Sequence, residues 1–195
     1  SINKIDPDQW DFPAGTILNS KDRLLIWCNG SRDPEIGPKD YLNTGISLDG
    51  KYGSVYLFNS SEQIIDSVQY GFQISNTSIG RTKNGEWNLL QIPSPGKSNE
   101  IPHQTATASS ITINEWTSGG SGNDWIELHN TSTLPIDLGG NYLSDDLSLI
   151  GHTKFEIPEL NFIDAGGFVK WIADGNLSQG ADHLNFSISS LGGPI

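Results

Sequence analysis

Carboxylate side chains are the groups in this 195-residue chain that could carry out acid–base chemistry. Glu115 and Glu127 lie in two apolar segments separated by a Gly-rich stretch, so folding could bring them together as a general acid and base. Catalysis would also need an activated nucleophile or base beside the pair, and the sequence places none there. We therefore expect no catalytic residues and no enzymatic activity.

Metal binding is the next chemistry to consider. The four histidines are scattered along the chain without the H-x₃₋₅-H spacing of zinc sites. Asp124, Asp145 and Asp146 offer oxygen ligands of the kind Ca²⁺ prefers, which makes them the candidate calcium ligands. The twelve-residue EF-hand pattern is absent, and turn formation explains these side chains equally well. We expect no metal ion and no cofactor.

Aromatic side chains could instead bind a sugar ring. Of the six tryptophans, Trp27 and Trp171 lie inside apolar segments and are expected in the core. Trp10 and Trp87 lie outside such segments and are the candidate ligand-binding residues. The single cysteine, Cys28, cannot form an internal disulfide, and its apolar surroundings predict a buried thiol.

The composition excludes several classes of partner. A net charge of −12 argues against nucleic-acid binding, because phosphate contacts need clustered Lys and Arg. It also disfavours adhesion to anionic membranes, and no apolar stretch is long enough to span a bilayer. Because the chain contains no Met, even at position 1, we expect it to be a processed or excised piece of a larger protein, so its lack of a signal peptide does not argue against export.

The elements that would position these side chains are predicted to be β-strands. Short segments rich in β-branched and aromatic residues alternate with clusters of turn residues, and no window has sustained helical periodicity. Asp49-Gly50 and Asn84-Gly85 have the dipeptides of tight hairpin turns. The predicted strands are residues 24–27, 54–59, 64–70, 111–116, 124–130 and 167–173. Together they predict an all-β sandwich or barrel.

An internal repeat governs how these strands are grouped. Residues 12–50 are echoed by residues 155–192, with Trp27 matching Trp171. The segments before the second copy have no counterpart before the first, and those after the first have none after the second. A Pro-rich segment, residues 92–110, is the predicted seam between the two parts.

Two ordered sets of motifs carry a resemblance to a known family. One set reads INEW, then DWIELHN, then IDLGGNYLSDD; the other reads FPAGT, IDSVQYG, SIGR and SPGKSN (residues 111–146 and 12–99). Together they resemble the lamin tail domain, an immunoglobulin-like β-sandwich. The resemblance implies the back part of one such domain in residues 1–100 and the front part of a second in residues 101–195. It also implies structural roles for Glu115 and Glu127.

The resemblance further implies a non-catalytic binding, adhesion or accessory module of a larger secreted or cell-surface protein, with a protein or glycan partner. Two alternatives remain open: a carbohydrate-binding module, and a fragment of an extracellular hydrolase.

Because each part lacks some strands, three arrangements are possible. The front strands could complete the back part within one molecule as a permuted sandwich, leaving residues 155–195 redundant. They could complete the back part of a second molecule by strand swapping, or each part could fold alone as a truncated sandwich.

Overall fold

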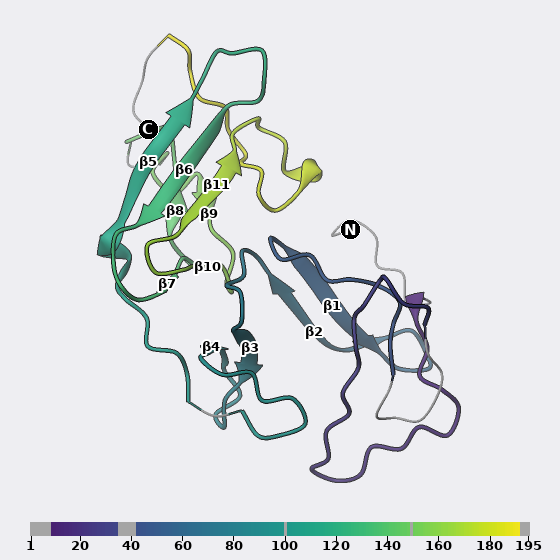
Figure 1. Cartoon of the computed structure of the whole chain (residues 1–195). Coiled ribbons are helices and arrows are strands. Elements are labelled where there is room, and N and C mark those ends of the chain that lie inside the picture. Colours follow the sequence, from purple (N-terminus) through teal and green to yellow (C-terminus); the bar gives the residue numbers. More distant parts are fainter. Residues whose placement is uncertain (1–8, 35–41, 100, 149, 192–195) are drawn as a thin grey trace.

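In the computed structural model, the described residues are 9–34, 42–99, 101–148 and 150–191, and within them the chain is all-β (Figure 1). This confirms the prediction of an all-β fold. The strands are β1 (Gly53–Phe58), β2 (Ile64–Tyr70), β3 (Ser78–Arg81), β4 (Trp87–Leu90), β5 (Ile111–Thr117), β6 (Trp125–Asn130), β7 (Ile136–Asp137), β8 (Tyr142–Leu143), β9 (Phe155–Glu156), β10 (Phe162–Ile163) and β11 (Phe168–Ile172). Two one-turn 3₁₀ helices, η3 (Ala108–Ser110) and η4 (Leu177–Gln179), complete the described elements.

The C-terminal region, residues 101–191, is built on a three-stranded antiparallel sheet in the order β11-β6-β5. Strand β6 alternates as predicted: Ile126 and Leu128 are buried while Trp125 and Glu127 face outward, half-buried. The pairs β7–β10 and β8–β9 form the opposing side. Between them lies the main core: Ile126, Leu128, Ile136, Leu138, Leu143, Phe155, Ile157, Ile163, Trp171, Ala173, Leu184, Phe186 and Ile188.

The N-terminal region, residues 9–99, contains two hairpins, β1–β2 and β3–β4, joined by residues 71–77. Irregular chain, described at residues 9–34 and 42–52, precedes β1 (Figure 1). The predicted turn at Asn84-Gly85 joins β3 to β4, and Gly85 has a φ of +87°, which glycine adopts without strain. Asp49-Gly50 does not form a hairpin, because it precedes β1 and the β1–β2 connection lies at residues 59–63. That prediction was wrong: the dipeptide alone does not show where two strands pair.

A second, smaller core joins the two regions. Leu89 from the N-terminal region packs with Leu160 and Phe162 from the C-terminal region. Main-chain hydrogen bonds reinforce the contact: Gly71 N–H donates to Leu160 O at 3.1 Å, and Phe162 N–H donates to Phe72 O at 2.9 Å. The last strand of the β1–β2 hairpin therefore runs directly into the contact between the regions.

The two copies of the repeat take different surroundings. The second copy pairs with the strands before it, through β11–β6, β10–β7 and β9–β8, so the idea that residues 155–195 would be redundant was wrong. In the first copy, Trp27 forms one isolated bridge with Asn43 and is 53 % exposed, and the predicted strand at residues 24–27 does not form. Cys28 is exposed, not buried as predicted. Residues 35–41 of the first copy and residue 192 of the second lie outside the described residues.

Candidate functional site

Strand β11 lies at one border of the three-stranded sheet and pairs with β6 on one side only. At its two ends, Asn130 N–H donates to Gly167 O at 3.0 Å and Ala173 N–H donates to Asp124 O at 2.7 Å. Hydrogen-bonded positions alternate along an antiparallel ladder, so Val169 and Trp171 also point their main-chain groups at β6. The main-chain groups of the intervening residues point away from the sheet.

The far end of this free border is already occupied. Ile172 N–H donates to Asp182 O at 2.8 Å, and Leu184 N–H donates to Ile172 O at 2.7 Å, which is a short parallel bridge. Within the described residues, the N–H and C=O of Phe168 and of Lys170 have no protein partner on this side. These four groups form a short open template for another strand.

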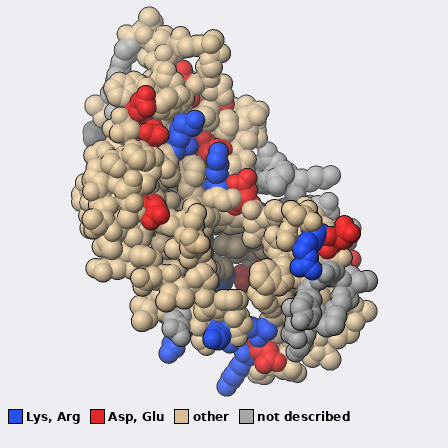
Figure 2. Space-filling model, viewed as in Figure 1, with Lys and Arg blue, Asp and Glu red and all other residues tan. Residues whose placement is uncertain are grey.

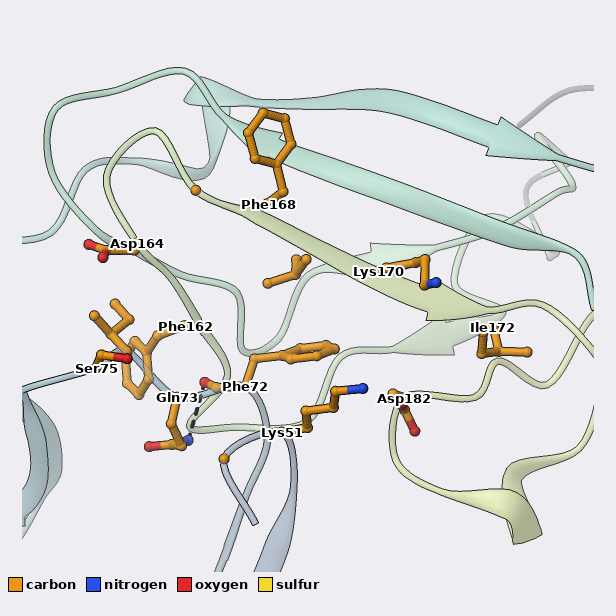
Figure 3. A pocket seen from close by; sticks show the side chains of 14 residues that line it. Lys51, Phe72, Gln73, Ser75, Phe162, Asp164, Phe168, Lys170, Ile172 and Asp182 are labelled. Atoms are coloured by element: carbon orange, nitrogen blue, oxygen red, sulfur yellow. Dashed lines mark hydrogen bonds between the residues drawn. The ribbon is translucent and has the colours of Figure 1, made fainter.

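A hollow of about 490 Å³ lies along this open stretch (Figure 3). That volume falls within the range of ligand pockets, about 300–1,000 Å³. We call it the β11 groove, and both regions contribute to its walls. Its lining residues are Gly50, Lys51, Phe72, Gln73, Ile74, Ser75, Phe162, Asp164, Gly167, Phe168, Val169, Lys170, Ile172 and Asp182.

Phe72 forms the apolar wall opposite β11. Its ring packs edge-to-face on Trp171, with centroids 4.9 Å apart at 85°, and its N–H donates to the Asn161 side chain at 2.9 Å. The Gln73 side chain donates to Leu160 O at 3.1 Å, which holds the next residue against the C-terminal region. Gly71 is needed here because a Cβ would lie 1.8 Å from the Asn161 side-chain oxygen. The wall is therefore fixed by packing and by hydrogen bonds.

The charged residues that line the groove are two lysines and two aspartates: Lys51, Lys170, Asp164 and Asp182. Figure 3 shows Lys51 and Asp182 near the Ile172 end, and Asp164 near the Phe168 end. Over the face shown in Figure 2, acidic and basic side chains are likewise interspersed, despite the net charge of −12. The groove therefore has no single strong charge to attract a highly charged small ligand.

The tryptophans predicted to bind ligand lie elsewhere. Trp87 is covered by the Arg81 guanidinium, which stands 4.5 Å from the ring centre and also pairs with Asp66 at 2.8 Å. Trp10 packs edge-to-face on Phe12 at 5.0 Å. Neither residue lines the β11 groove, whose described lining comes from other residues.

The three calcium candidates have protein partners. An Asp124 carboxylate oxygen accepts from Gly119 N–H at 3.1 Å, and one from Asp146 accepts from Ser148 N–H at 2.8 Å. Asp145 forms an ion pair with Lys154 at 2.6 Å. Among the described residues, no three His, Cys, Asp or Glu side chains are grouped closely enough to hold a metal ion.

The carboxylate pair does come together in space. Glu115 and Glu127 are opposite each other across the β5–β6 ladder, on the outer face of the sheet. The Asn114 side chain donates to Glu127 at 2.7 Å.

Two aspartates elsewhere in the C-terminal region have shifted pKa values. Partial desolvation raises the pKa of Asp137, and a hydrogen bond from the Ser148 N–H lowers the pKa of Asp146. Neither aspartate is among the described lining residues of the β11 groove, so the carboxyl groups with shifted pKa values do not converge on it.

Sequence reasoning missed the groove. It identified the β11 segment as a strand, but nothing in that segment shows which side of it stays unpaired. Phe72 follows IDSVQYG in a loop with no apolar period. Its role depends on Trp171, which lies about a hundred residues further along the chain.

No helix among the described residues is both long and apolar enough to cross a membrane. Comparisons of the chain with protein-family models, with curated proteins and with solved structures found no match.

Proposed function

We propose that this chain is a non-catalytic binding module that takes an extended peptide segment as an added strand on β11. The observation that carries the proposal is the open stretch of main chain at Phe168 and Lys170, facing a hollow with an apolar wall. Strand addition to an exposed sheet border draws affinity from main-chain hydrogen bonds and specificity from the pockets beside them. The β11 groove supplies both.

The wider context of this function is also a proposal. The strand motifs resemble those of lamin tail domains, which supports an immunoglobulin-like arrangement and an adhesion or accessory role in a larger secreted or cell-surface protein. Peptide capture suits such a role, because it needs only a rigid scaffold and an unpaired strand.

The test uses uncharged, fluorescently labelled hexapeptides of alternating Val and Thr, capped at both ends, with binding to the full chain followed by anisotropy. Lys170→Pro deletes one N–H that faces the groove and leaves the hydrogen bonds to β6 in place. Lys170→Ala is the matched control, since it removes the same side chain and keeps that N–H.

We expect the wild-type and the Lys170→Ala protein to bind alike. Lys170→Pro should bind about tenfold more weakly, because it loses one main-chain hydrogen bond to the peptide. Equal binding by the two variants, or no binding by the wild-type protein, would refute strand addition. Binding of a glycan, abolished by Trp10→Ala or Trp87→Ala, would instead support the carbohydrate-binding alternative.

A further inference from the structure

We infer, on the basis of the proposed function, that the peptide bound by the β11 groove carries a three-residue motif: an apolar residue flanked on one side by an aromatic residue and on the other by an acidic one. The motif follows from which side chains of β11 and its neighbours each ligand residue would meet.

The spacing comes from the geometry of a β-ladder. The open main-chain groups belong to Phe168 and Lys170, so these two residues would hydrogen-bond to the ligand strand. In an antiparallel ligand the residues opposite them would make the bonds, and in a parallel ligand the residues on either side of those would. Opposed residues in a sheet project their side chains to the same face, and successive residues alternate. The ligand residue between them, opposite Val169, therefore points to the inner side.

The inner side is apolar. Val169 and Phe72 both pack against the main core, and Phe162 is 3 % exposed in the smaller core beside them. A polar side chain placed here would lose its hydration without gaining a fixed partner. The central residue of the motif is therefore an aliphatic one, such as Val or Ile.

The outer side at Phe168 favours an aromatic residue. The Phe168 ring is 54 % exposed and stacks on His129, with centroids 4.3 Å apart and planes at 6°. Figure 3 shows this ring on the opposite side of β11 from Phe72. An aromatic ligand side chain opposite it would extend this stack and cover an exposed apolar surface.

The outer side at Lys170 favours a carboxylate. The Lys170 ammonium lies 5.6 Å from the Trp125 ring centre, while Glu127, its cross-strand neighbour, accepts a hydrogen bond from Asn114. Lys51 lies at the same end of the groove, where Figure 3 shows it near Asp182. An acidic ligand residue opposite Lys170 would form an opposite-charge cross-strand pair.

The experiment measures anisotropy of two labelled, capped peptides, Gly-Ser-Phe-Val-Glu-Ser-Gly and its reverse order Gly-Ser-Glu-Val-Phe-Ser-Gly, because the strand direction decides which order fits. For the better peptide we expect about threefold weaker binding when Glu becomes Gln, and about tenfold weaker binding to Lys170→Glu. A Lys-for-Glu peptide should restore binding to Lys170→Glu. Lys83→Glu, an exposed lysine outside the described lining of the groove, is the matched control and should bind as wild type.

The outcomes separate the motif from the function. If the uncharged Val/Thr peptide binds as tightly as both motif peptides, and the charge exchange has no effect, the motif is wrong while strand addition stands. If neither motif peptide nor the uncharged peptide binds, the motif and the proposed function both fall.

Discussion

The two copies of the internal repeat use the same residue pattern in two different environments. Trp171, in the second copy, is 1 % exposed, whereas its counterpart Trp27 is 53 % exposed. The second copy has β6 beside it, with Ile126 and Leu128 directed into the shared core. Among the described residues, no such strand covers Trp27, whose one β-bridge there is to Asn43.

In the described part of the first copy, a buried polar residue beside the buried Leu42 holds the chain together by hydrogen bonds. Asn43 is 0 % exposed, and its side-chain amide donates to the carbonyls of Asn29, Arg32 and Asp33 at 3.1–3.2 Å. The comparison teaches that an apolar strand pattern specifies what a segment can bury. Whether it is buried depends on a neighbouring strand, and among the described residues the second copy has such a neighbour in β6.

The largest expected effect separates the two tryptophans. Trp171→Ala should lower the free energy of unfolding by about 3–5 kcal/mol, because it removes a fully buried ring and leaves a cavity. Trp27→Ala should change it by less than about 1 kcal/mol, since about half of the residue is already exposed to solvent. Chemical denaturation of both variants measures the difference. Similar losses would mean that Trp27 is covered in solution.

Phe72 tests how strongly the N-terminal region depends on the better packed C-terminal region. Phe72→Ala should cost about 2–4 kcal/mol and should weaken peptide binding, because the ring contacts Trp171 and forms a wall of the β11 groove. Phe58→Ala, in the β1–β2 hairpin that precedes Phe72 and outside both core clusters as described, is the control and should leave peptide binding unchanged. Denaturation and anisotropy give the two readouts. Unaltered peptide affinity in Phe72→Ala would contradict the assigned wall.

Asn43 tests the polar organisation of the first copy. Asn43→Ala should lower the free energy of unfolding by about 1–3 kcal/mol, because it leaves partly buried main-chain groups without partners. The loss should appear as faster proteolytic cleavage near residues 29–33 as well as in denaturation. A variant with wild-type stability and wild-type cleavage would show that the first copy is held by other contacts.

The smallest expected effects are on how the stability of the C-terminal region depends on pH. The pKa of Asp137 is raised by partial desolvation, against the Gly139 hydrogen bond that lowers it. The folded state therefore holds this proton more tightly than the unfolded state, and stability falls as pH rises from about 4 through the raised pKa. Asp137→Asn should remove that fall, so at neutral pH the free energy of unfolding of the variant should exceed that of wild type by less than about 1 kcal/mol.

Asp146 should behave in the opposite way. Hydrogen bonds from Ser148 lower its pKa, so it stabilises the folded state above its unfolded pKa, and this contribution is lost as pH falls through the folded value. Asp146→Asn should therefore lower stability at neutral pH and match wild type in acid. Denaturation from pH 3 to 7 tests both variants, and parallel curves for all three proteins would contradict both pKa shifts.

The elements were largely predictable because local pattern dictates them. Alternation at Trp125–Asn130 predicted both the strand and its buried face, and Asn84-Gly85 predicted a hairpin turn. The failures share one physical cause. The local sequence alone was used to predict burial of Trp27 and Cys28 and a hairpin turn at Asp49-Gly50. Burial and strand pairing, however, depend on a segment together with its neighbours in space.

The candidate site was less predictable for the same reason. The open border of β11 exists because β6 pairs on one side and residues 182–184 stop at Ile172. The opposite wall exists because Phe72 reaches Trp171 across a long stretch of sequence. Neither relation leaves a local mark, whereas the tryptophans chosen from sequence, Trp10 and Trp87, are engaged with Phe12 and Arg81.

The most direct test of the account is hydrogen exchange of single β11 amides, measured by NMR with and without a saturating uncharged Val/Thr peptide. The account predicts slow exchange at Val169 and Trp171 in both samples, because both pair with β6. It predicts fast exchange at Phe168 and Lys170 in the free protein and slow exchange once the peptide is added. Protection of these two amides in the free protein, or continued fast exchange with peptide bound, would contradict an open strand border that captures a peptide.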